Sequence, residues 1–137
     1  MSKQWNGKNC PVCFKGTLKH GVKKTSFEYR GKTLEYGQAG AWCNRCEEGV
    51  MTGTEASSTE ALLDAFISRV DKEEAAELAR IRRKLKLTQK EAARITGGGH
   101  NAFSRYERGE AKPVPAVINL FRLLDRHPEL LKELKAA

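Results

Sequence analysis

The sequence predicts an α+β protein of two domains, a small β module followed by an all-α domain of five helices. The chain has 137 residues, which is enough for two small domains. All four cysteines fall in its first third, whereas apolar residues recur at helical spacing farther along. We expect the first domain to span 1–55, a linker and connecting helix 56–75, and the helical domain 76–137.

The four cysteines form two Cys-x-x-Cys pairs, Cys10 with Cys13 and Cys43 with Cys46. Two such turns supply the four thiolates of a closed tetrahedral zinc site. Because a filled shell leaves no position for an activated water, we expect one structural Zn²⁺ per chain. Zinc binding contributes roughly 10–16 kcal/mol in small zinc modules. A redox pair is the alternative, and it requires a βαβ setting that is not visible in the sequence.

A β-hairpin is predicted between the two cysteine pairs. Residues 25–30 and 33–42 are rich in Thr, Phe, Tyr and Trp, and Gly31-Lys32 separates them. The order of pair, hairpin and pair predicts a zinc-ribbon-like module. We expect His20 on a strand surface, because four cysteines already complete the metal shell.

The middle of the chain predicts a linker and one helix. Residues 51–60 are small and polar, with Ser57 or Ser58 as the expected helix cap. Apolar residues then recur at helical spacing from 62 to 70. We expect the acidic run 71–77 to be a solvated break before the second domain.

From residue 76 onward the chain is predicted to form five short helices. The second begins at a capping box made by Thr88 and Glu91. Gly97, Gly98 and Gly99 follow it and permit a left-handed exit and a sharp turn. A tight turn between two short helices predicts a helix-turn-helix.

The helix after the glycines has two distinct faces. Polar residues share about 100° of arc, and apolar ones lie opposite: Asn101, Ser104, Arg105 and Arg108 against Ala102, Phe103 and Tyr106. Arg forms two hydrogen bonds with the edge of guanine, and Asn does so with adenine. Each such pair contributes about 1–3 kcal/mol of discrimination against the wrong base. We therefore expect Asn101 and Arg105 to read bases of double-stranded DNA. A helical domain with a flexible turn and solvated Asn and Arg is the alternative.

Further DNA contacts are expected around these two residues. The candidates are Thr88, Gln89, Lys90, His100, Ser104 and Arg108. An exposed turn histidine is the simpler interpretation of His100. The basic cluster formed by Arg80, Arg82, Arg83 and Lys84 is expected to add nonspecific attraction.

Charge and motifs narrow the class of protein. The net charge is +8, divided as +5 over 1–50, −5 over 51–77 and +8 over 78–137, which favours a polyanionic partner. We find no signal peptide and no apolar stretch that spans a membrane, so we expect a cytoplasmic protein. Hydrolase motifs such as Gly-x-Ser-x-Gly and His-Glu-x-x-His are missing, and we expect no catalytic residues and no enzyme.

The C-terminal segment carries more apolar residues than a one-sided helix needs. The main apolar stripe is formed by Val117, Leu120, Phe121 and Leu124. Three more residues widen it, namely Val114, Ile118 and Leu123. The surplus indicates either a fuller core or a subunit contact, and we expect a two-fold homodimer through the C-terminal domain. Its two reading helices would then lie about 34 Å apart along DNA.

The run LTQKEAARITGGGHNAFSRYERGEAKP resembles the Xre-type helix-turn-helix of the MqsA antitoxin family. The resemblance extends from Cys10 to about Leu131 and includes the ending LLDRHPELL. It implies an antitoxin whose four-cysteine zinc domain captures a ribonuclease toxin. The C-terminal domain of such antitoxins dimerises and represses its own operon at a palindromic operator. By position, the four cysteines match the zinc ligands, and Asn101 and Arg105 match the base-reading pair.

Two features depart from the family pattern. The segment Ser2 to Lys8 is extra and precedes the first cysteine pair, and His100 stands where we expect an apolar residue. A free-standing helix-turn-helix regulator with a structural zinc domain and no toxin is one alternative function. A thiol oxidoreductase is the other, and stoichiometric zinc with four unreactive thiols would exclude it.

Overall fold

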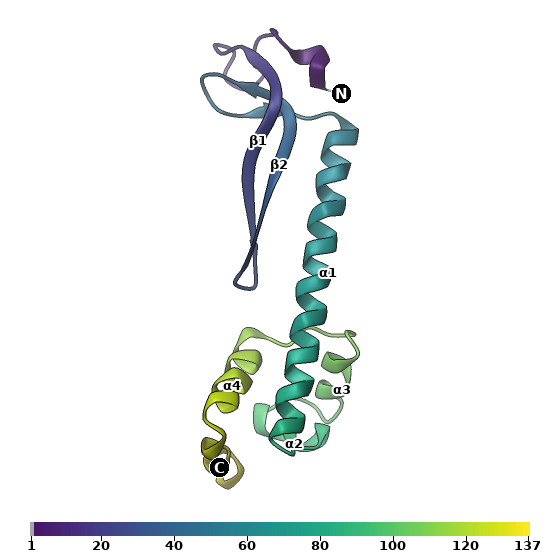
Figure 1. The fold of residues 1–137 in the computed structure, drawn as a ribbon, viewed down its shortest axis with the longest axis vertical. Coiled ribbons are helices and arrows are strands. Elements are labelled where there is room, and N and C mark those ends of the chain that lie inside the picture. Colours follow the sequence, from purple (N-terminus) through teal and green to yellow (C-terminus); the bar gives the residue numbers. More distant parts are fainter. Residues whose placement is uncertain (1) are drawn as a thin grey trace. The chain divides into compact units, whose positions relative to one another are not determined.

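Figure 1 shows the computed structural model of the chain, which describes residues 2–137. The α+β fold class is confirmed: a three-stranded antiparallel sheet with four cysteines precedes five α-helices. The chain divides into two compact units, Met1–Ile67 and Ser68–Ala137. Among the described helices, none combines the length and the apolar character that crossing a bilayer requires.

The sheet of the first unit is built on one long hairpin. Its strands β1 (Leu18–Tyr29), β2 (Lys32–Cys43) and β3 (Gly49–Val50) lie in the order β1-β2-β3. The predicted hairpin is therefore present, but β1 begins at Leu18 rather than at residue 25. The turn is Arg30-Gly31, one residue earlier than expected, with φ of 49° and 80°. Two left-handed residues define a type I′ turn, whose twist matches that of the strands.

The hairpin packs against the first part of α1 (Gly53–Lys84) within this unit. The rings of Phe27 and Phe66 meet edge to face, with centroids 6.1 Å apart. The hydroxyl of Thr59 donates to the side chain of buried Gln38. Figure 1 shows the hairpin running beside this part of α1. These contacts attach the hairpin to α1 and leave the ring of Phe27 half-buried.

The middle of the chain differs from our prediction, because α1 is one continuous helix. It begins at Gly53 and not after Ser57 or Ser58, since Thr52 and Glu55 exchange side-chain and backbone hydrogen bonds of 3.0 and 3.4 Å. Such reciprocal bonds are a capping box. The acidic run 71–77 continues the helix, because Glu is a good helix former. The domain limits at 55 and 75 stay predictions.

The second unit is helical. The end of α1 is followed by α2 (Gln89–Thr96), α3 (Ala102–Glu107), α4 (Pro115–Arg126) and α5 (Leu131–Ala136). A short 3₁₀ turn, Pro128–Leu130, precedes α5. Phe103 is fully buried, and its ring centroid lies 5.1 Å from that of Phe121 and 5.5 Å from that of Tyr106. This aromatic cluster joins α3 to α4 and fixes which face of α3 is turned outward.

Candidate functional site

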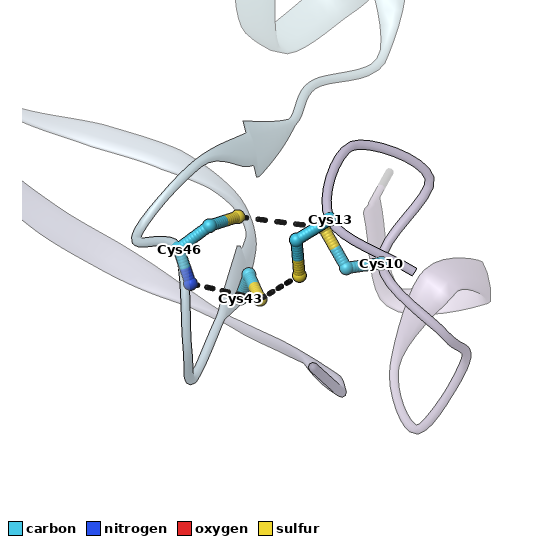
Figure 2. A group of neighbouring side chains, drawn as sticks. All are labelled: Cys10, Cys13, Cys43 and Cys46. Carbon is cyan, nitrogen blue, oxygen red and sulfur yellow. Dashed lines mark hydrogen bonds between the residues drawn. The ribbon is translucent and has the colours of Figure 1, made fainter. Parts of the chain in front are cut away.

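The four cysteines converge at one point of the first unit (Figure 2). Their sulfur atoms all lie within 4.8 Å of one another. The Cys10 and Cys46 sulfurs are 3.6 Å apart, and those of Cys13 and Cys43 are 3.7 Å apart. A tetrahedron with Zn–S bonds of about 2.3 Å has sulfur–sulfur edges of about 3.8 Å. The donor set and its spacing therefore fit a tetrahedral metal ion.

Backbone N–H groups support the sulfurs. Val12 N–H points at the Cys10 sulfur at 3.4 Å, and Arg45 N–H points at the Cys43 sulfur at 3.3 Å. The residue after the second cysteine of each pair is left-handed: Phe14 has φ 61° and Glu47 has φ 65°. The two turns thus have the same local form, which directs their N–H groups inward to stabilise thiolate charge.

Gly16 is a functional position that the sequence did not reveal. A Cβ added there would lie 2.2 Å from the Cys43 sulfur. Its N–H donates to the Cys13 sulfur at 3.3 Å, and its carbonyl accepts from Cys10 N–H at 2.8 Å. Because Gly16 contacts three of the four cysteines, only a residue without a side chain fits between the two turns.

The electrostatics of the cluster favour a bound cation. Backbone N–H groups of Lys15 and Gly16 lower the pKa of the Cys13 thiol to about 6. The N–H of Glu48 lowers the pKa of Cys46, but burial and the neighbouring sulfurs outweigh it and raise that pKa to about 12. The first thiolate therefore forms easily and the last is opposed by the others. A cation at the centre removes this opposition.

In the second unit, the predicted reading residues lie on the exposed side of the helix-turn-helix. Asn101 precedes α3 as its N-cap residue, and Arg105 lies on the outer face of α3. Both side chains are exposed, while Phe103 faces the core. Ser104 is half-buried, and exposed Arg108 donates to the Ser104 carbonyl at 3.2 Å and to Glu110 at 3.0 Å.

The start of α2 has the predicted capping box. Glu91 N–H donates to the Thr88 hydroxyl at 3.1 Å, and Thr88 N–H donates to the Glu91 carboxylate at 3.2 Å. Thr88 and Lys90 are exposed, and Gln89 is half-buried. The capping-box prediction is therefore confirmed, and the beginning of α2 is open to a partner on this side.

Two of the glycines between α2 and α3 have conformations or contacts that require glycine. Gly97 has φ 77° and ends α2 in a left-handed conformation, as predicted. A Cβ on Gly98 would come within 3.0 Å of the Ala102 Cβ, so α3 starts close to the turn. His100 is exposed. The two glycines thus provide the sharp change of direction that sets α3 against α2.

The basic cluster that we expected to attract DNA is largely engaged within the protein. Arg82 and Glu107 form a two-pronged ion pair of 2.7 and 2.9 Å, with side chains only 13% and 10% exposed. Arg80 and Lys84 both pair with Asp125, at 3.0 and 2.8 Å. Sequence spacing gave no signal for these pairs, because their partners lie on distant helices. Arg82 instead joins α1 to the end of α3.

The structure thus defines a class: a protein with a four-cysteine β module in one unit and a helix-turn-helix in the other. The chain belongs to the MqsA antitoxin family, whose model, described as the antitoxin component of a bacterial toxin-antitoxin system, matches residues 8–135. Antitoxin MqsA of Escherichia coli strain K12 is 46% identical over 129 residues, covering 92% of this chain and 98% of that protein. The solved N-terminal domain of E. coli MqsA is 33% identical and covers 45% of this chain and 94% of that domain, with a TM-score of 0.41.

Proposed function

We propose that this chain is the antitoxin of a type II toxin-antitoxin pair, which neutralises a ribonuclease toxin and represses its own operon. The observation that carries the proposal is the family match over residues 8–135, which includes both the cysteine pairs and the helix-turn-helix. Neutralisation is assigned to the domain 1–55 and repression to the domain 76–137. A zinc ion held by Cys10, Cys13, Cys43 and Cys46 maintains the first of these domains.

The repression half of the proposal rests on the chemistry of α3. Asn101 and Arg105 are exposed, whereas the ring of Phe103 is buried in the core. The packing of Phe103 therefore keeps the face that carries Asn101 and Arg105 turned outward. Asn and Arg make the best two-pronged contacts with adenine and guanine edges in the major groove. Thr88, Gln89, Lys90, His100, Ser104 and Arg108 would then contact phosphates or flanking groups.

Dimerisation completes the repression model. Of the three residues that widen the apolar stripe, Ile118 is buried in the core, whereas Val114 and Leu123 are exposed by 57% and 41%. Exposed apolar residues beyond those that the core uses favour a subunit contact. A two-fold dimer would present two copies of α3 to a palindromic operator. The oligomeric state of the full chain is measured by sedimentation. A monomer at micromolar concentration would contradict the proposed dimerisation.

The neutralisation half is tested by recovering the partner. The tagged full chain is isolated from its native cells, treated with nuclease, and its bound proteins are identified by mass spectrometry. We expect a small ribonuclease-like protein at near-equal stoichiometry that is lost when residues 1–55 are deleted. If no such partner is recovered while promoter DNA still binds tightly, the chain is a free-standing regulator.

A further inference from the structure

The segment Ser2–Lys8, which we call the strap, is bound along β1 beside the cysteine cluster. Its first residues form a 3₁₀ turn, Ser2–Trp5. Leu18 exchanges two backbone hydrogen bonds with the strap, of 2.8 and 2.9 Å. The backbone N–H of His20 donates to the Asn6 side chain at 2.9 Å. The strap therefore extends the hydrogen bonding of β1 at an edge that would otherwise be open.

Ser2 fastens the start of the strap to two other elements. Its side chain is fully buried, and its hydroxyl donates to Glu55 of α1 at 2.7 Å. The same oxygen lies 2.7 Å from Nδ1 of His20. Because a hydroxyl has one proton and Glu55 receives it, His20 must donate from Nδ1 to the Ser2 oxygen. One buried side chain thus links the strap to β1 and to the start of α1.

The other end of the strap leads directly to the cysteine cluster. Trp5 packs against the core formed by Cys10, Leu18, Ala41 and Cys43. Cys10 follows the strap by two residues and is the most buried of the four cysteines, at 1% exposure. Asn9, between them, bridges to Thr17. These contacts therefore restrain the backbone on the N-terminal side of Cys10.

We propose that the strap retains the metal, because it sets the rate at which Cys10 can detach. This inference rests on the zinc site of the proposed function. Complete loss of the ion requires all four sulfurs to detach. The backbone hydrogen bonds between the strap and Leu18 restrain the chain just before Cys10. The family model begins at residue 8, so nearly the whole strap lies outside the part of the chain that it matches.

The test measures how fast the full chain releases zinc. Zinc content is determined first, and release to excess 4-(2-pyridylazo)resorcinol is then followed by absorbance. Ser2→Ala removes the hydrogen bonds to both Glu55 and His20, and we expect release about tenfold faster. Asn6→Ala removes one contact of an exposed residue, so the fold is kept, and we expect release about threefold faster. The matched control is Ser57→Ala, because the Ser57 side chain is exposed and its hydroxyl donates to the Thr54 carbonyl at 3.1 Å, within α1 itself.

A second control separates the strap from general stability. Phe27→Ala weakens the contact with Phe66, away from the strap, and should leave the release rate close to that of the unaltered chain. The proposal is overturned if Asn6→Ala and Ser2→Ala release zinc no faster than Ser57→Ala, or if Phe27→Ala accelerates release as much as they do. If the purified chain holds no zinc, the zinc site itself is refuted and the strap proposal with it.

Discussion

Replacing Gly16 with Ala should damage the cysteine cluster more than any other single methyl group added to a glycine of this unit. The new Cβ would lie 2.2 Å from the Cys43 sulfur, 3.1 Å from the Asn44 side-chain oxygen and 3.2 Å from the Arg45 Cβ. Ordinary contacts of this kind are about 3.5 Å or longer, so Cβ and sulfur must separate by about 1.3 Å. Metal–sulfur distances in working sites tolerate only about 0.2 Å.

The displacement reaches more than one ligand. Gly16 N–H bonds to the Cys13 sulfur and the Gly16 carbonyl accepts from Cys10 N–H, so moving this backbone disturbs both. Loss of a supporting contact alone weakens metal affinity about 10–100-fold. Because Gly16→Ala also displaces a ligand, we expect zinc affinity to fall at least about 100-fold, or about 2.7 kcal/mol.

The assay is an equilibrium competition between the full chain and a zinc chelator of known affinity. Gly21→Ala is the matched control, because Gly21 lies in β1 and a Cβ there would meet nothing within 4 Å. We expect the control to bind zinc as the unaltered chain does. Equal zinc affinity for Gly16→Ala and Gly21→Ala would refute the steric reasoning.

Three further predictions concern the helical unit. Arg105→Ala should weaken binding to cognate DNA by about 1–3 kcal/mol and relax the sequence preference at one base pair, as measured by competition binding. An equal loss of affinity for all sequences would show that Arg105 contacts a phosphate and reads no base. Glu107→Gln leaves the guanidinium of Arg82 buried without its charged partner, and should lower the free energy of unfolding in urea by about 3 kcal/mol. The control is Glu110→Gln, which removes the charged partner of exposed Arg108 and should change the free energy of unfolding by less than about 1 kcal/mol. Hydrogen bonds from Arg80 and Lys84 lower the pKa of Asp125 from 3.8 to about 2, so its stabilisation is present above pH 4 and is lost as the pH falls towards 2. Thermal unfolding of Asp125→Asn should therefore show a smaller decrease in Tm over that range, and an unchanged decrease would contradict this.

The sequence by itself determined the features that depend on short spacing. Two Cys-x-x-Cys pairs around β-forming segments predicted the cluster and the hairpin, and Thr88 with Glu91 predicted the start of α2. The pattern around Phe103 predicted which side of α3 is buried. Each of these follows from a local rule of turn, strand or helix periodicity, which needs no knowledge of the rest of the fold.

Tertiary structure decided what depends on partners far along the chain. The ion pair of Arg82 with Glu107 joins residues 25 positions apart, and the bond of Ser2 with Glu55 joins residues 53 positions apart. The closeness of Gly16 to the Cys43 sulfur exists only once the two turns meet. The continuity of α1 was missed because an acidic run does not by itself end a helix. Such features arise from how elements pack against each other, and residue spacing does not encode which distant surfaces will meet.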